Sequence, residues 1–224
     1  MPDFRFIQDP TSDKWIILAP KRAKRPNQDH GAEPPCPFEG GDEAEIFSIN
    51  QARVVANKFP FAPIHEIIIH SDDHHKNFDE LPLSQSEDVF KVFRSRFQEH
   101  KGKGQVYIFH NQGKRAGESL PHPHTQLAVV PSEVKLEIPG LHLNLEEKKD
   151  LSHLYIFCPN ISHWPDEVWI APHRSNRYFD ETVFKYYRRR GGGRYKSSFG
   201  CEKAGQPKEL IILVFPPSLQ GRFG

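Results

Sequence analysis

Short runs of β-branched and aromatic residues recur along the first 130 positions, each bounded by proline, glycine or polar residues. Runs of this kind are typical of buried β-strands. The first part of the chain is therefore expected to form a sheet. The predicted strands are residues 15–18, 53–56, 66–69, 105–109 and 127–130.

One segment between these strands has the periodicity of a helix. Val89, Phe93 and Phe97 recur every four residues, with Phe90 beside them, over a stretch from about residue 84 to residue 101. These apolar side chains are expected to pack on the sheet as core. Because strands both precede and follow the helix, we predict an α+β fold with a mainly antiparallel sheet.

The two ends of this helix also carry signals. Ser84, followed three residues later by Glu87, matches a capping box and predicts the first turn. Gly102 is expected to end the helix, because glycine readily adopts the left-handed conformation that terminates helices.

Composition narrows the choice of partners. The chain has 224 residues with 30 basic and 29 acidic side chains. Its net charge is therefore close to zero and gives no overall positive electrostatic field that would attract nucleic acid. No apolar run approaches the length of a membrane span, and so we expect neither nucleic acid nor a membrane as partner. Cys36, Cys158 and Cys201 are too few, and odd in number, for a disulfide framework. The reducing cytoplasm is the expected compartment.

The most informative segment runs from Asn111 to Gln126. It contains His122 and His124, which are two residues apart, stiffened by two prolines and followed by an apolar strand. Alternate residues of a strand share a face, so His122, His124 and Gln126 are expected to point the same way. Neutral imidazole is a good nucleophile with a pKa near neutrality, which suits attack on phosphorus. The alternative is a surface loop that holds two histidines incidentally.

The chain also contains an internal echo. Residues 66–80 resemble residues 167–181, since both have a strand, a basic turn and then Phe-Asp-Glu. We interpret this as a duplicated unit, complete in residues 1–145 and incomplete in residues 146–224. From about residue 188 the sequence becomes rich in arginine and glycine. We expect the second unit to be truncated, or read out of frame, from that point.

Five segments resemble blocks of the galactose-1-phosphate uridylyltransferase family, part of the histidine-triad superfamily, in the family's order. A single His-Pro-His motif would be weak support, whereas five blocks in sequence are specific. The resemblance implies a histidine-triad-like fold. The segments are residues 9–26, 36–41, 56–60, 71–74 and 111–126.

The resemblance implies nucleotidyl transfer between a nucleotide sugar and a sugar 1-phosphate, with UDP-glucose and galactose 1-phosphate, in galactose metabolism, as the first expectation. His124 would attack the α-phosphorus and hold the nucleotidyl group, which the sugar 1-phosphate would then remove. Ser119 and Gln126 would supply catalytic hydrogen-bond donors. The resemblance assigns substrate binding to Arg22, Arg25, Asn57, Asn111 and Gly117.

The resemblance further implies a metal site. Its ligands would be Cys36, Glu39, His74 and His122, with Glu39 in place of the second cysteine of a Cys-x-x-Cys loop. Zinc accepts sulfur, nitrogen and carboxylate oxygen, so this replacement is chemically tolerable. The ion would tether the N-terminal loop to the strand of His124, a structural role. The alternative is that this change records a site that has lost its metal.

Two further functions stay open. An ADP-sugar phosphorylase would use the same His124 chemistry on an adenine nucleotide, and a catalytically impaired remnant would bind a nucleotide without reacting. The family draws residues for base and sugar choice from its second domain and a partner subunit. The resemblance therefore suggests a homodimer, and an incomplete second unit predicts low or no turnover.

Overall fold

The structure is a computed structural model, and its described residues fall into two units that we treat separately. The first unit holds the predicted nucleophile, and the second contains three short strands. The described residues are 3–25, 36–39, 44–112, 118, 120–135, 148–151, 154–157 and 169–172.

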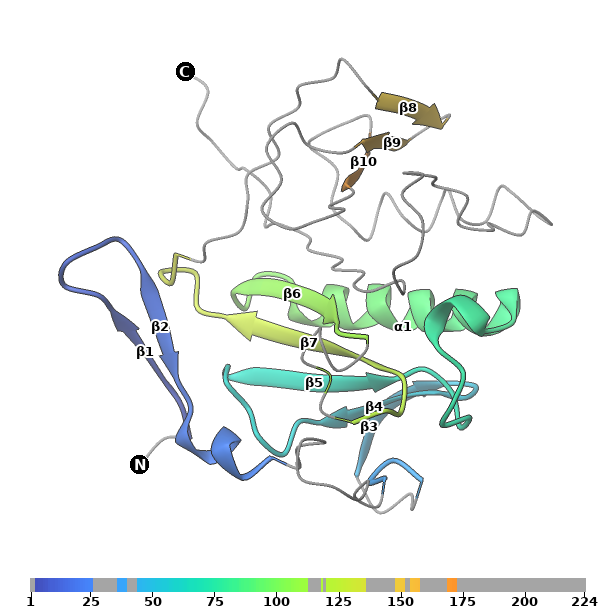
Figure 1. Ribbon diagram of the computed structural model, residues 1–224, viewed down its shortest axis with the longest axis horizontal. Coiled ribbons are helices and arrows are strands. Elements are labelled where there is room, and N and C mark those ends of the chain that lie inside the picture. The colour runs from blue at the N-terminus through green and yellow to red at the C-terminus, as the bar shows by residue number, and fades with distance from the viewer. Residues whose placement is uncertain are drawn as a thin grey trace, which may run out of the picture. The chain divides into compact units, whose positions relative to one another are not determined.

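A five-stranded antiparallel sheet forms the centre of the first unit (Figure 1). Its strand order is β3–β4–β5–β7–β6, so β7 lies between two partners, and every residue of β7 is buried. The strand that begins with His124 is therefore an interior strand held on both edges. The bounds are Glu45–Ile49 for β3, Ala52–Ala56 for β4, Ile64–Ile69 for β5, Gln105–His110 for β6 and His124–Val130 for β7.

The α-helix α1, Leu83–His100, packs against one face of this sheet (Figure 1). Its buried residues include Val89, Phe93 and Phe97, and these side chains form part of the core as their spacing predicted. The α+β class with a mainly antiparallel sheet is confirmed. The opposite face of the sheet is left for the predicted site.

The end of α1 follows the prediction, but its start does not. Gly102 has φ of 85°, the left-handed conformation expected of a glycine that terminates a helix. The predicted capping box at Ser84 is wrong, because the helix begins one residue earlier with Pro82 at the N-cap position. A capping box is present instead between Asn77 and Glu80, in the short 3₁₀-helix η3, Phe78–Glu80.

All five predicted strands are confirmed, and the structure extends four of them by one to three residues. In the first unit two described strands were missed: β1, Arg5–Gln8, and β3. The strands at residues 148–151 and 154–157 of the second unit were not predicted either. Most side chains of β1 and β3 are exposed, so their sequences lack the apolar run that marks a buried strand.

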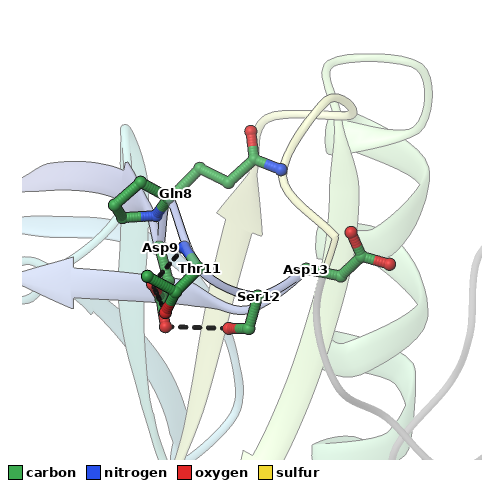
Figure 2. Close-up of a pocket in the computed structure, with 6 residues that line it drawn as sticks. Gln8, Asp9, Thr11, Ser12 and Asp13 are labelled. Atoms are coloured by element: carbon green, nitrogen blue, oxygen red, sulfur yellow. Dashed lines mark hydrogen bonds between the residues drawn. The ribbon is translucent and has the colours of Figure 1, made fainter.

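β1 pairs with β2, Trp15–Leu18, in an antiparallel hairpin. In the connecting loop the Asp9 carboxylate accepts hydrogen bonds from the Thr11 amide and from the hydroxyls of Thr11 and Ser12 (Figure 2). This loop lines an open pocket with Gln8, Pro10 and Asp13. None of the residues predicted for the active site lies in it.

Beneath the sheet, a charged cluster joins β5 to α1. Arg96 donates two hydrogen bonds to the Glu66 carboxylate, at 2.9 and 2.7 Å, and His100 Nε2 lies 2.9 Å from Glu66 Oε1. Burial alone would raise the pKa of Glu66, but hydrogen bonds from His100 and Arg96 outweigh it and lower that pKa. The helix is therefore fixed to the central sheet by the buried Glu66 carboxylate, whose negative charge is balanced by Arg96.

The second unit contains a three-stranded antiparallel sheet in the order β10–β9–β8. The strand β10 falls where the internal echo predicts one, while the duplication and the 145/146 boundary stay predictions. The tail from residue 188 lies outside the described residues. Among the described residues, no helix combines the length and apolar character needed to cross a bilayer. The bounds are Lys148–Leu151 for β8, Leu154–Phe157 for β9 and Trp169–Pro172 for β10.

Candidate active site and metal centre

His124 is the first residue of β7, and its side chain lies on the face of the sheet opposite α1. It pairs in register with Ile69 of β5, and Gln126 pairs with Ile67, so His124 and Gln126 share this face as predicted. His122 precedes the strand rather than lying on it. His124 is buried, with 7% of the residue exposed.

The hydrogen bonding of His124 fixes its tautomer. Its Nδ1 atom lies 2.7 Å from the backbone oxygen of His122, and a carbonyl oxygen can only accept, so Nδ1 carries the proton. Burial lowers the pKa of His124 to about 4, with a smaller contribution from nearby Arg25. The ring is therefore neutral at physiological pH, and Nε2 holds a lone pair. This is the form that a nucleophilic imidazole requires.

Gln126 is held by a residue that the sequence did not suggest. His65 of β5 is buried, and its Nε2 atom lies 3.0 Å from Gln126 Oε1. The signal available in the sequence was a single histidine inside an apolar strand, and such a residue more often belongs to the core. Only the pairing of β5 with β7 brings it to the site.

The two predicted arginines approach the same region from the 3₁₀-helix η1, Pro20–Lys24, and the residue after it. Arg22 Nη1 donates to the backbone oxygen of Phe59 at 2.7 Å, and its guanidinium lies over the Phe61 ring. Burial lowers the pKa of Arg22 to about 10 and also lowers the pKa of Arg25. Both remain cations at neutral pH, and their charge near His65 and His124 suits an anionic ligand.

The remaining predicted contacts divide into described and undescribed residues. Asn57 lies next to His65, with its Nδ2 atom 3.1 Å from His65 Nε2. Asn111 is half-buried and directly follows β6. Ser119 and Gly117 lie outside the described residues, so their roles stay predictions.

The structure brings the four predicted metal ligands together. One potential donor atom from each lies within 4.8 Å of all the others. His74 Nδ1 is 3.0 Å from Glu39 Oε1, and His122 Nδ1 is 3.5 Å from Cys36 Sγ. The cluster joins the loop of residues 36–39, the turn after β5 and the turn before β7. Its members are Cys36, Glu39, His74 and His122.

The orientation of these donors fits a metal ion. His122 Nε2 donates to the backbone oxygen of Ser71 at 2.9 Å, so Nδ1 keeps its lone pair and directs it at Cys36. His74 Nδ1 is buried and has no hydrogen-bond partner among the described residues, although Glu39 is close. A lone pair, a thiol, a carboxylate and an orphaned imidazole nitrogen thus converge on one point. These residues could hold a metal ion.

The metal loop also touches the nucleophile. Phe38, between Cys36 and Glu39, has its ring centroid 5.6 Å from those of both His122 and His124. Arg53 holds this loop by donating to the Phe38 backbone oxygen at 2.9 Å. Phe38 therefore contributes to the burial that lowers the pKa of His124.

A central strand that begins with a buried, neutral histidine, backed by one helix and flanked by four potential metal ligands, defines the class: an α+β protein with a candidate histidine nucleophile. Residues 62–130 match the family described as galactose-1-phosphate uridyl transferase, N-terminal domain. This match, together with the relatives below, confirms the resemblance of the chain to the galactose-1-phosphate uridylyltransferase family.

Curated relatives include two kinds of enzyme. The chain is 24% identical to an ADP-glucose phosphorylase from Arabidopsis thaliana, over 80% of this chain and 68% of that protein. It is 25% identical to a galactose-1-phosphate uridylyltransferase from Thermotoga maritima, over 74% of this chain and 65% of that protein. The chain thus spans about two thirds of the length of these relatives.

Solved structures share the fold. An ADP-glucose phosphorylase from Arabidopsis thaliana with bound ADP-glucose superposes with a TM-score of 0.54 at 19% identity, over 83% of this chain and 73% of that chain. A uridylyltransferase superposes with a TM-score of 0.60 at 20% identity, over 82% of this chain and 72% of that chain.

Proposed function

We propose that this chain transfers a nucleotidyl group between a nucleotide sugar and a sugar 1-phosphate through a covalent intermediate on His124. The first substrates we propose are UDP-glucose and galactose 1-phosphate. The observation that carries the proposal is the hydrogen bond from His124 Nδ1 to the His122 backbone oxygen, which leaves the Nε2 lone pair for attack.

The chemistry proceeds in two displacements. Nε2 of His124 attacks the α-phosphorus of UDP-glucose, an N–P bond forms, and the bond to the bridging oxygen breaks to release glucose 1-phosphate. A phosphate oxygen of galactose 1-phosphate then attacks the same phosphorus, and the N–P bond breaks. Both steps place negative charge at one site, where positioning and charge stabilisation dominate. Arg22, Arg25 and the Gln126 amide would supply the stabilising donors, and Ser119 and Gly117 are proposed beside them.

We propose zinc as the ion for the four-ligand cluster. Its mixed sulfur, nitrogen and oxygen donors match zinc, which forms closed four-coordinate structural sites. When bound, zinc would hold the loop of Cys36 and Glu39 against the turns of His74 and His122, and would take no part in the transfer. The three cysteines of the chain suit a cytoplasmic location, and a homodimer is the proposed assembly.

ADP-glucose phosphorylase activity is the second candidate. It is favoured by the similarity to the Arabidopsis thaliana enzyme of that name. The same His124 would then carry an adenylyl group, and inorganic phosphate would remove it. The third possibility, a remnant that binds without reacting, differs from both in forming no covalent adduct.

Labelling separates these functions. Purified protein is incubated with UDP-glucose or ADP-glucose carrying ³²P at the α-phosphorus, and the acid-labile protein-bound label is counted. We expect label with UDP-glucose, its discharge by galactose 1-phosphate, and its loss in His124→Asn. Stronger label with ADP-glucose and discharge by phosphate would favour the phosphorylase. Nucleotide binding without label would contradict both enzymes.

A further inference from the structure

His65 occupies a position beside the proposed nucleophile that its sequence context does not suggest. On β5 it pairs with Ala128 of β7, while Ile67 pairs with Gln126. Alternate residues on one strand and partners across two strands share a face, so His65 lies on the face of Gln126 and His124. His65 is 5% exposed, which means that its polar atoms must find partners within the protein.

The partners of His65 determine its tautomer. The Phe61 backbone N–H donates to His65 Nδ1 at 3.3 Å, so Nδ1 is the unprotonated nitrogen. A neutral imidazole carries one proton, which must then be on Nε2, and Nε2 donates to Gln126 Oε1 at 3.0 Å. Burial, together with nearby Arg22 and Arg25, lowers the pKa of His65 to about 4, so the neutral form prevails near pH 7.

This hydrogen bond orients the Gln126 amide. Because the amide oxygen accepts from His65, the two N–H donors of Gln126 lie on the other side of the carboxamide. Turning the amide over would set its N–H groups against the N–H of His65 and leave buried polar groups unpaired, which is costly. His65 therefore selects one of the two orientations of Gln126.

Asn57, the other amide beside His65, is oriented by the backbone and not by His65. Its Oδ1 atom accepts from the Phe59 backbone N–H at 2.8 Å, so its amide nitrogen is the atom 3.1 Å from His65 Nε2. Since His65 Nε2 carries a proton, it cannot accept from Asn57. The contact that orients the amide of Gln126 is therefore the one from His65 Nε2 to Gln126 Oε1, and Asn57 takes no part in it.

The imidazole of His65 is also mechanically confined. The Phe61 ring packs edge-on at 4.3 Å between centroids, and Arg22 covers Phe61. The backbone oxygen of His65 accepts a hydrogen bond from the backbone N–H of Asn57 at 2.9 Å. The ring therefore cannot rotate away from Gln126 without disturbing the loop that also holds Arg22.

We propose that His65 is a positioning residue of this site: it holds the Gln126 amide so that its N–H donors are directed at the phosphate oxygens of the nucleotidyl group on His124. The proposal rests on the proposed nucleotidyl transfer, which it deepens. His65 touches no substrate and acts through Gln126. Neutral amide donors of this kind stabilise charge that develops during transfer.

Four variants test the proposal: His65→Asn, His65→Gln, Gln126→Ala and the double variant His65→Asn/Gln126→Ala. Glutamine can place an amide N–H near the former Nε2, whereas asparagine is too short to do so. The rate constant for ³²P labelling of His124 is measured in a single turnover, and nucleoside diphosphate affinity is measured by calorimetry. His75→Asn makes the same change at an exposed histidine, and circular dichroism confirms folding.

We expect His65→Asn to slow labelling by about 10- to 100-fold, and His65→Gln to recover most of that loss. In the Gln126→Ala background, His65→Asn should cause no further loss. Labelling of His65→Asn at the wild-type rate would overturn the proposal. The proposal would also be overturned if His65→Asn slowed labelling as much in the Gln126→Ala background as it does in the wild type. If wild-type protein takes no label, the proposed transfer fails. The role of His65 is then tested by the affinity for nucleoside diphosphate. If His65→Asn weakens binding only in proteins that retain Gln126, positioning is supported; any other pattern overturns it.

Discussion

His124 Nδ1 lies 2.7 Å from the backbone oxygen of His122, whereas His122 directs its own Nδ1 at Cys36 Sγ, 3.5 Å away. The two histidines of one tripeptide therefore have opposite tautomers. His124 is protonated on Nδ1 and keeps its Nε2 lone pair, while His122 is protonated on Nε2, which donates to Ser71. The first form suits a nucleophile, and the second suits a metal ligand.

This relationship predicts that the two side chains can be separated by mutation. His124→Asn should lower covalent labelling by at least about 10³-fold, because the attacking atom is removed. His122→Asn keeps the backbone oxygen that fixes His124, so it should retain measurable labelling but lose metal affinity by more than the about 10- to 100-fold that loss of an outer-shell partner costs. Single-turnover labelling and metal content by mass spectrometry measure the two effects. Equal loss of labelling in both variants would contradict the separation.

The carboxylate at position 39 gives a second prediction. Glu39 is more than half exposed and is the one oxygen donor of the cluster. Glu39→Cys should bind zinc more tightly than wild type, because thiolate is a softer and stronger zinc ligand, and Glu39→Ala should bind it about tenfold or more weakly. Competition with a chromophoric chelator gives the affinities. Identical affinities in all three proteins would show that residue 39 does not coordinate the ion.

If the proposed zinc is bound, treating wild-type protein with a chelator should lower the melting temperature, since a ligand that binds only the folded state stabilises it. The matched control is Cys36→Ser treated with the same chelator, in which the shift should be smaller. A melting temperature that chelation leaves unchanged in both proteins would mean that no structural ion is bound.

Some of this arrangement could be predicted from the sequence, because the signals were local. Apolar runs marked the five predicted strands, four of which belong to the central sheet, and the spacing of Val89, Phe93 and Phe97 marked the helix that packs on that sheet. The missed strand β3 has mostly exposed side chains, so its sequence lacks the apolar run that would have predicted a strand. The start of the helix was predicted from the capping-box pattern at Ser84, but the helix begins after Pro82 instead.

The residues of the site also differ in whether they could be predicted from the sequence. Cys36, His74 and His122 are far apart in sequence, and only the resemblance to a family grouped them before the structure brought them together. His65 could not be found in this way. Its role depends on which strand pairs with β5 and in which register, and nothing within residues 64–69 specifies that β7 lies beside it.

The charged cluster beneath the sheet predicts a large stability effect. Arg96→Met should reduce the free energy of unfolding by about 3–5 kcal/mol, because it leaves the buried Glu66 carboxylate without its bidentate partner. The double variant Glu66→Gln/Arg96→Met should be more stable than Arg96→Met alone, since it removes the uncompensated charge. Urea unfolding measures both. If the double variant is the less stable of the two, Glu66 is not a buried charge that depends on Arg96.

Glu66 also predicts a loss of stability in acid. Its folded-state pKa is lowered, so it contributes stability above its ordinary value near 4.5, and that stability is lost as the pH falls through the lower folded value. Glu66→Gln should lack this part of the acid dependence. Urea unfolding below about pH 5 compares the two proteins, and parallel curves would contradict the assignment.

His65 predicts a pH dependence at higher pH and of different origin. Its pKa is about 4 in the folded protein, mainly through burial, against 6.5 for an ordinary histidine. Between these values the unfolded chain binds a proton that the folded chain excludes, so the free energy of unfolding should fall as the pH drops from 6.5 to 4. For His65 alone the loss amounts to about 3 kcal/mol, and it vanishes above pH 6.5.

The comparison that isolates this effect is wild type against His65→Gln, because the other buried histidines titrate in both proteins. Urea unfolding at several values from about pH 7 to pH 4 should give curves that diverge near neutrality and converge toward acid, with wild type losing more stability. Gln126→Ala is the control for the hydrogen bond, since it removes the acceptor while His65 stays buried and titratable. A constant difference between wild type and His65→Gln across the range would mean that His65 is protonated equally in the folded and unfolded chains, and the tautomer that orients Gln126 would lose its basis.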